Sequence, residues 1–234
     1  LLPTPLAPNT VTLGQLLSDP LDPSSESFIS TSIRQALQEP SIQSRYKDLV
    51  SYDDEGRLVS SLHGRPLSPS QENLLVIQAD EMKYCSLKHP SASFNALRQD
   101  PAAQTWFRQM QNRPLYYVVG VQQLKNPTFK RAVIKEGSVA EASTDSKIRI
   151  PMHVRRDSAM DLDEPSNDGV FGLEVRKVKC RVGSPAEPHT LDDIDLSWTY
   201  HMLDADDDLQ LSIGLGHALS AAELRGLAGI VSDD

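Results

Sequence analysis

The side chains best placed to bind a ligand are bases gathered in the second half of the chain. Twelve of the 23 lysines and arginines lie between residues 125 and 181. Such a cluster predicts a surface for an anionic partner, such as phospholipid headgroups or nucleic acid. The twelve bases are Lys125, Lys130, Arg131, Lys135, Lys147, Arg149, Arg155, Arg156, Arg176, Lys177, Lys179 and Arg181.

The C-terminal segment has the opposite charge. Residues 185–234 contain eleven carboxylates and one base, Arg225, so they carry a net charge of −10. Because the whole chain carries −9, residues 1–184 carry +1. The negative total argues against nucleic acid as the partner, and the acidic segment is suited to mask a basic surface. The alternative is that both sets of charges are solvated and serve only solubility.

Signatures of enzymes and of cofactor sites are absent from the sequence. There is no nucleophile elbow, no phosphate-binding loop ending in Gly-Lys-Ser/Thr and no His-Glu-x-x-His motif. The acidic run 204–208 lacks the glycine and the glutamate of a calcium loop, and the six histidines are scattered singly. We therefore expect no enzymatic activity, no cofactor and no bound metal. Two cysteines without a CxxC pair favour a reducing compartment.

Two runs in the basic region alternate as amphipathic strands do. Residues 147–155 place Ile148, Ile150, Met152 and Val154 on one side and Lys147, Arg149, His153 and Arg155 on the other. Residues 170–182 alternate as well, but the apolar positions change from odd to even near Arg176 and Lys177, which predicts a β-bulge there. Together, residues 128–182 are expected to form a long meander of amphipathic strands.

The remaining elements must hold these strands in place. Strands are expected at 10–17, 74–78, 115–121, 198–202 and 209–215, and the apolar run 115–121 suits a central strand covered on both faces. Helices are expected at 28–39, 91–99 and from Asp100, with 41–72 mostly loop and one short strand. Asp100 and Pro101 form a helix start that puts Trp106, Phe107 and Met110 on one face.

A last helix is signalled from Ala221 by the capping box of Ser220 and Glu223. Leu224, Leu227, Ile230 and Val231 would share its apolar face. These elements predict an α+β fold with a central, twisted, mostly antiparallel sheet and flanking helices. We expect a body over residues 1–184 and an acidic segment over 185–234 that packs on the same domain. No run approaches 18 apolar residues, so no transmembrane helix is expected.

This order of elements resembles the gasdermin pore-forming domain over roughly residues 10–182. The residues that carry the resemblance are the strand from Val11 to Pro20, Leu74–Gln78, the helix with Trp106, Tyr116–Val121 and a long β-hairpin that closes on Gly172–Val178. The absence of a large helical repressor domain is similar to the fungal gasdermins, which act in regulated cell death and non-self recognition. The family has a Gly/Ser-rich first hairpin before Leu74, whereas 28–72 is expected to be partly helical and irregular.

The resemblance implies a latent, non-enzymatic pore former. Gasdermins bind acidic phospholipids, oligomerise and insert β-hairpins that close into a pore, because an open sheet would leave backbone groups unpaired in hydrocarbon. The twelve bases would then bind lipid or line the lumen. The resemblance also implies a cytoplasmic latent form, a membrane-bound active form, homo- or hetero-oligomers, and an inhibitory C-terminal segment released by a protease or a partner protein. The alternative is a soluble interaction module whose acidic tail binds another protein.

Overall fold

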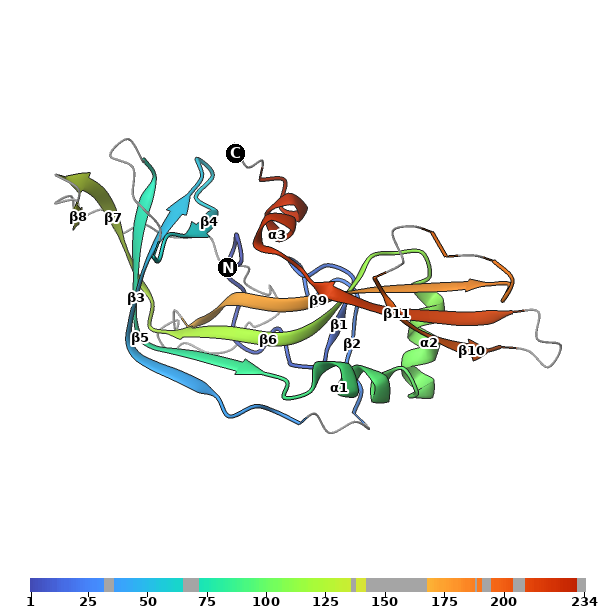
Figure 1. The fold of residues 1–234 in the computed structure, drawn as a ribbon. Coiled ribbons are helices and arrows are strands. Elements are labelled where there is room, and N and C mark those ends of the chain that lie inside the picture. Colours follow the sequence, from blue (N-terminus) through green and yellow to red (C-terminus); the bar gives the residue numbers. More distant parts are fainter. Residues whose placement is uncertain are drawn as a thin grey trace, which may run out of the picture.

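A computed structural model describes residues 1–31, 36–64, 72–135, 138–141, 168–187, 189–190, 195–203 and 209–230, with only the backbone described for residues 135 and 138–141. Within these ranges lie eleven strands and three helices (Figure 1). The strands are β1 (Leu16–Leu17), β2 (Ser27–Phe28), β3 (Ser41–Tyr52), β4 (Leu58–Ser61), β5 (Leu74–Ser86), β6 (Leu115–Lys125), β7 (Thr128–Lys135), β8 (Ser138–Glu141), β9 (Gly169–Gly183), β10 (Ser197–Met202) and β11 (Gln210–Ala218). The helices are α1 (Pro90–Leu97), α2 (Pro101–Gln109) and α3 (Ala221–Leu227).

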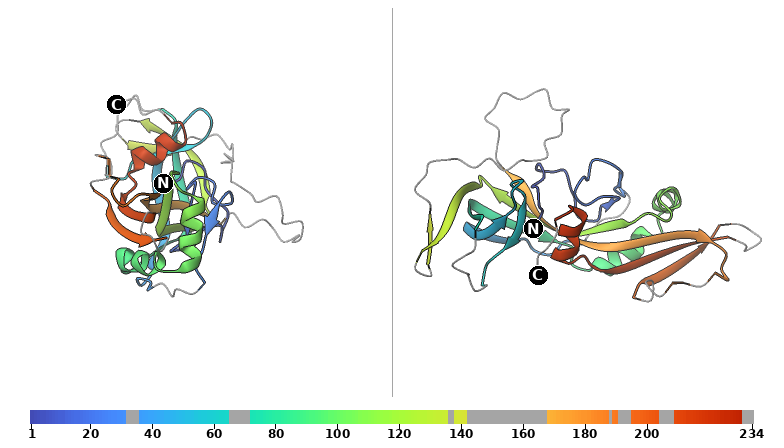
Figure 2. Two further views of the ribbon diagram at one scale, coloured as in Figure 1. Left: turned by 90° about the vertical axis from the view of Figure 1, so that its right-hand side faces the viewer. Right: turned by 90° about the horizontal axis from the view of Figure 1, so that it is seen from above.

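All of these strands belong to one antiparallel sheet. Its main path runs β10-β11-β9-β6-β5-β3-β4, while β1 joins β6, β2 joins β1, and β7 joins β5 and β8. Helices α1 and α2 lie on one side of the sheet and α3 on the other (Figures 1 and 2). This arrangement confirms the predicted α+β fold with a mostly antiparallel sheet and flanking helices. Strands β10 and β11, which come from the acidic segment, extend the same sheet as β9.

Strands β6 and β7 follow one edge of β5 in a single register. Glu81 pairs with Lys125 in β6, and Gln78 pairs with Thr128 in β7, so the pairing continues in step across the turn at Asn126 and Pro127. Asn126 has a φ of 48°, and its side-chain amide donates to Asp80 Oδ2 at 2.9 Å. Proline has no N–H to offer a sheet, so it suits this interruption. The two strands differ in their second partner: β6 also pairs with β9, whereas β7 also pairs with β8.

The central strand β6 is buried on both faces, as predicted. Tyr117 and Val119 pack with Phe94, Phe107 and other side chains of α1 and α2. Tyr116 and Val118 face the other way, into a cluster built from the N-terminal segment, β9 and α3. The sheet is therefore the middle of three layers. The outer layer on the α3 side is thin, because it consists of one short helix and irregular chain.

The two helices predicted after residue 90 are confirmed. Asp100 caps α2 by accepting a hydrogen bond from the Ala102 N–H at 3.0 Å, and Pro101 occupies the first helical position. Trp106, Phe107 and Met110 are buried against the sheet, as expected. Their side chains form part of the hydrophobic core.

The predictions for residues 28–72 were wrong in two places. Among the described residues of 28–39, Phe28 ends β2 and Leu37 forms an isolated bridge with Leu87, so the predicted helix is not found there. Residues 41–72, predicted as mostly loop with one short strand, contain the four-residue strand β4 and also the twelve-residue strand β3. Residues 41–45 of β3 are exposed, so no apolar alternation marks them as a strand. Pairing with β5 through the backbone holds them instead.

Two other predicted strands have different lengths. In 10–17 only Leu16 and Leu17 are in a strand, because the chain turns at Gly14, whose φ is 83°. The predicted strand 74–78 extends to Ser86.

The change of parity in β9 has a different cause from the predicted bulge. Pairing of β9 with β6 is unbroken from Val178 to Val175. Val175 packs in the cluster on the α3 side and Val178 packs against α1 and α2, so the side of the sheet that buries β9 changes between them. Register shifts flank this segment in the neighbouring strands, in β6 between Val118 and Gly120 and in β11 between Leu215 and Ala218.

Candidate functional site

The structure places seven of the twelve predicted bases with their side chains. These are Lys125 in β6, Lys130 and Arg131 in β7, and Arg176, Lys177, Lys179 and Arg181 in β9. Lys135 ends β7, but its side chain is not among those described. Lys147, Arg149, Arg155 and Arg156 lie outside the described residues, together with the whole predicted strand 147–155.

The bases of β9 divide between the two faces of the sheet. Arg176 points to the α1 side, where its guanidinium donates to Ser91 Oγ at 3.1 Å. Lys177, Lys179 and Arg181 alternate with Val178 and Cys180, which are buried on that side. These three bases therefore project toward the α3 side, and we call them the cationic face of β9.

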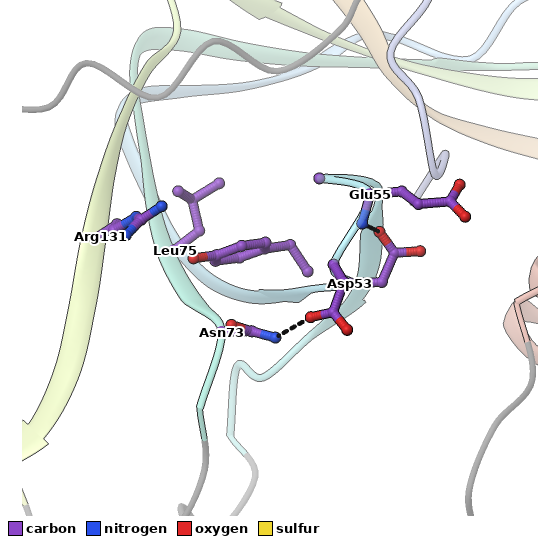
Figure 3. A pocket seen from close by; sticks show the side chains of 8 residues that line it. Asp53, Glu55, Asn73, Leu75 and Arg131 are labelled. Carbon is purple, nitrogen blue, oxygen red and sulfur yellow. Dashed lines mark hydrogen bonds between the residues drawn. The ribbon is translucent and has the colours of Figure 1, made fainter.

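The bases of β7 lie in another part of the sheet. Arg131 pairs with Leu75 and lines a cavity of about 420 Å³, across from the acidic turn that contains Asp53, Asp54 and Glu55 (Figure 3). Within that turn Asp53 Oδ2 accepts a hydrogen bond from Arg57 Nε at 2.7 Å. Arg131 thus faces carboxylates, and the structure does not gather it into one patch with the cationic face of β9.

Helix α3 docks beside that cationic face. Its capping box is formed as predicted: Ser220 Oγ accepts from the Glu223 N–H at 3.2 Å, and Glu223 Oε2 accepts from the Ser220 N–H at 2.8 Å. The other carboxylate oxygen of Glu223 forms an ion pair with Lys177 Nζ at 2.5 Å. The same carboxylate therefore starts the helix and neutralises one base of β9.

Apolar and backbone contacts complete the docking of α3. Leu224 is 5% exposed and packs in the cluster that also contains Tyr116 and Val175. Before the helix, the Leu219 N–H donates to the Val175 carbonyl at 2.8 Å. After it, the Arg57 guanidinium donates to the Ala228 carbonyl at 3.0 Å. The helix is thus held at its start, middle and end by three different segments of the body.

The predicted apolar face of the tail is only partly correct. Leu224 and Ile230 are buried, whereas Leu227 is 46% exposed. In a helix of seven residues, only a narrow stripe can face the body, and Leu227 falls outside it. Val231 lies outside the described residues.

The ion pair gives the docking a predicted dependence on pH. Its hydrogen bond from Lys177, together with those from Ser220, lowers the pKa of Glu223 to about 2 from its ordinary value of 4.5. A carboxyl whose pKa is lowered by folding stabilises the folded form above its ordinary pKa, and that contribution is lost as the pH falls toward the lowered value. We therefore expect α3 to stay docked from pH 7 to about pH 4.5 and to loosen between pH 4.5 and 2.

The chemical shifts of the α3 amides, followed by NMR from pH 7 to 2, would measure this loosening. Glu223→Gln is the matched control, because glutamine retains the capping box but carries no charge. In that variant the step between pH 4.5 and 2 should disappear. Loosening that is centred above pH 5, or that is unchanged in the variant, would contradict the assignment.

Neither a metal site nor a membrane-spanning helix is found in the part of the chain that the structure describes. No three histidine, cysteine or acidic side chains come together there as metal ligands would. None of the described helices is both long enough and apolar enough to cross a bilayer.

The fold is similar to that of a bacterial gasdermin. That protein, from Bradyrhizobium tropiciagri, has 14% sequence identity to this chain, and the alignment covers 76% of this chain and 81% of the bacterial gasdermin with a TM-score of 0.37. No family model matches the sequence, and no curated protein matches it.

Several residues at this site were not identified from the sequence. Arg57 contacts α3 from a turn more than 160 residues earlier in the chain, and no local pattern signals such a contact. His189 stacks on Trp198 with ring centroids 4.2 Å apart, and its Nε2 lies 2.9 Å from the Tyr200 hydroxyl. The sequence predicted a strand over 198–202, but not the side of the sheet that Trp198 and Tyr200 face.

Proposed function

We propose that this protein is a latent, non-enzymatic membrane pore former that binds acidic phospholipids, oligomerises and inserts β-hairpins into the membrane. The observation that carries the proposal is the docking of α3, whose Glu223 neutralises Lys177 on the cationic face of β9. An acidic segment of the same chain thereby occupies a basic surface that is suited to anionic headgroups. Removal of the segment would return the positive charge to the surface.

The lengths of the strands support the second part of the proposal. A transmembrane β-strand needs about 9–11 residues, tilted across a hydrocarbon core of about 30 Å. β3 has 12 residues, β5 has 13 and β9 has 15. Since an open sheet edge is not tolerated in lipid, inserted strands must close into a ring of many copies. Homo- or hetero-oligomers on the membrane are therefore part of the proposal.

The latent form would be cytoplasmic and the active form would lie at the cell membrane. Its release would follow proteolysis of the C-terminal segment or the binding of a partner protein. From the resemblance of the order of elements to gasdermins, we extend the proposal to regulated cell death or non-self recognition in a fungus. Bases of the undescribed segment, such as Arg149 and Arg155, would act with the cationic face of β9 in lipid binding or in lining the lumen.

Dye leakage from liposomes tests the proposal. We expect a chain shortened by residues 219–234 to release dye from phosphatidylserine vesicles at least about tenfold faster than the full chain, since a loss of about 1.4 kcal/mol in docking already gives that factor. Vesicles of phosphatidylcholine alone should stay intact. Far-ultraviolet circular dichroism should verify that the shortened chain is folded. If a folded shortened chain leaves phosphatidylserine vesicles intact, the interaction-module alternative is favoured.

A further inference from the structure

Two rows of side chains cross the sheet on the same side as α3. In the first row Lys179 of β9 pairs with Gly214 of β11, which pairs with Trp198 of β10. In the second, Arg181 pairs with Ser212, which pairs with Tyr200. Paired residues of adjacent strands point to the same side of a sheet. Each row therefore has a base at one end, a small residue in the middle and an aromatic ring at the other end.

Because the middle residue of each row is small, no large side chain stands between the base and the aromatic ring. A Cβ atom on Gly214 would lie 3.0 Å from the Trp198 ring, so the indole rests directly on the backbone of β11. The bases and the rings stand two strand spacings apart, about 10 Å. We call the surface formed by Lys179, Arg181, Trp198 and Tyr200 the base–aromatic surface.

Two described residues of the connection between β9 and β10 lie over part of this surface, of which Tyr200 is still 49% exposed. The carbonyl of Glu187 accepts a hydrogen bond from the Arg181 guanidinium at 3.1 Å. His189 stacks on Trp198 and lies within hydrogen-bond distance of the Tyr200 hydroxyl. Glu187 thus lies over the basic end and His189 over the aromatic end.

We propose that the base–aromatic surface binds the headgroup layer of an anionic phospholipid membrane, and that Glu187 and His189 cover it in the latent form. Lysine and arginine attract anionic headgroups, and tryptophan and tyrosine favour the boundary between headgroups and acyl chains. The two kinds of side chain occupy opposite ends of the same rows, which suits a surface that meets phosphate and hydrocarbon together. This inference rests on the proposed function and adds a second cover, separate from α3.

Vesicle binding by single variants tests which face of β9 meets the lipid. In a chain shortened by residues 219–234, Arg181→Gln should weaken binding to phosphatidylserine vesicles roughly fivefold, as expected for one base near an anionic surface. Arg176→Gln is the matched control, because Arg176 lies on the opposite face of the same strand, and it should change binding less than twofold. His189→Ala in the full chain should strengthen binding at least about threefold by loosening the cover. Equal losses from the two arginine variants would overturn the inference.

The fluorescence of Trp198 gives an independent measurement. Trp106 and Trp198 are the two tryptophans of the chain, so Trp106→Phe leaves Trp198 as the reporter. Its emission should be quenched by vesicles of brominated-chain phosphatidylserine and should be unaffected by brominated phosphatidylcholine or by soluble glycerophosphoserine. If Trp106→Phe does not fold, the comparison of Arg181→Gln with Arg176→Gln still tests the inference.

The possible outcomes separate this inference from the proposed function. Leakage without quenching of Trp198 would overturn the inference and leave the pore former standing. A shift of the Trp198 emission with soluble glycerophosphoserine, without binding to vesicles, would replace the membrane by a free phosphate ester as the ligand. Neither binding nor leakage with any anionic vesicle would overturn both.

Discussion

Leu224→Ala is expected to release α3 and to convert the full-length chain into one that permeabilises phosphatidylserine vesicles. The side chain of Leu224 is buried between Tyr116, Val175 and the N-terminal segment. Removing a buried leucine side chain costs about 2–5 kcal/mol, and here the loss falls on the docking of one short helix. Because about 1.4 kcal/mol changes a population tenfold, the rate of dye release should rise at least about tenfold.

Leu227→Ala provides the control within the same helix. Leu227 is 46% exposed, so its removal should leave both the docking and the leakage rate near those of the parent chain. The two variants make the same chemical change three residues apart in one helix. If both leave phosphatidylserine vesicles intact, α3 does not restrain the protein. Equal leakage from both would mean that docking does not depend on the buried leucine.

Phe171→Ala should have the largest effect on stability, lowering the free energy of unfolding by about 3–5 kcal/mol. Its ring is fully buried and stacks on Phe129 of β7 with centroids 6.0 Å apart. It shares a cluster with side chains of β3, β4, β5 and β6. The Phe171 carbonyl also accepts a hydrogen bond from the Leu2 N–H at 2.7 Å. Phe171 therefore links β9 to the strands at the other end of the sheet.

Urea denaturation followed by circular dichroism would measure this loss. Val133→Ala in β7 is a suitable control, because Val133 is 39% exposed and its truncation should change the free energy of unfolding by less than about 0.5 kcal/mol. A loss below about 1 kcal/mol for Phe171→Ala would show that the cluster repacks around the missing ring, and that the two ends of the sheet are not joined there.

The parts of the fold that could be predicted are those with a local signal. Asp100 and Pro101 start α2, and Ser220 and Glu223 start α3, because capping depends on residues only a few positions apart. The apolar run of β6 indicated a strand covered on both faces, and it is one. Each of these signals is complete within a dozen residues, so no knowledge of the tertiary structure was needed.

Strand β3 could not be predicted because its signal lies in another strand. Its first residues are exposed and, apart from Ile42, polar, and a sequence rich in serine without apolar alternation is typical of a loop. Ten residues of β3 nevertheless pair with β5. The parity change in β9 was seen correctly, but its cause depends on which elements cover each side of the sheet. Periodicity along one strand carries no information about those elements.

For the candidate site, the sequence indicated the types of residue but not how they are grouped. It identified the bases of β9 and the capping box of α3, yet it gave no sign that Arg176 points away from Lys177, Lys179 and Arg181 toward α1. The contacts of Arg57 with α3, and of His189 with Trp198, depend on the path of connections between strands. Such contacts follow from the topology, which a charge pattern does not determine.

The shared register of β6 and β7 along β5 has a mechanical consequence. Both strands already pair with β5 in one register, so the segment from Leu115 to Lys135 could straighten into one continuous strand without a change of register. At about 3.3 Å per residue, 21 residues would extend close to 70 Å, more than twice the thickness of the hydrocarbon core. Asn126 has a left-handed φ of 48°, so its backbone must rotate for such straightening.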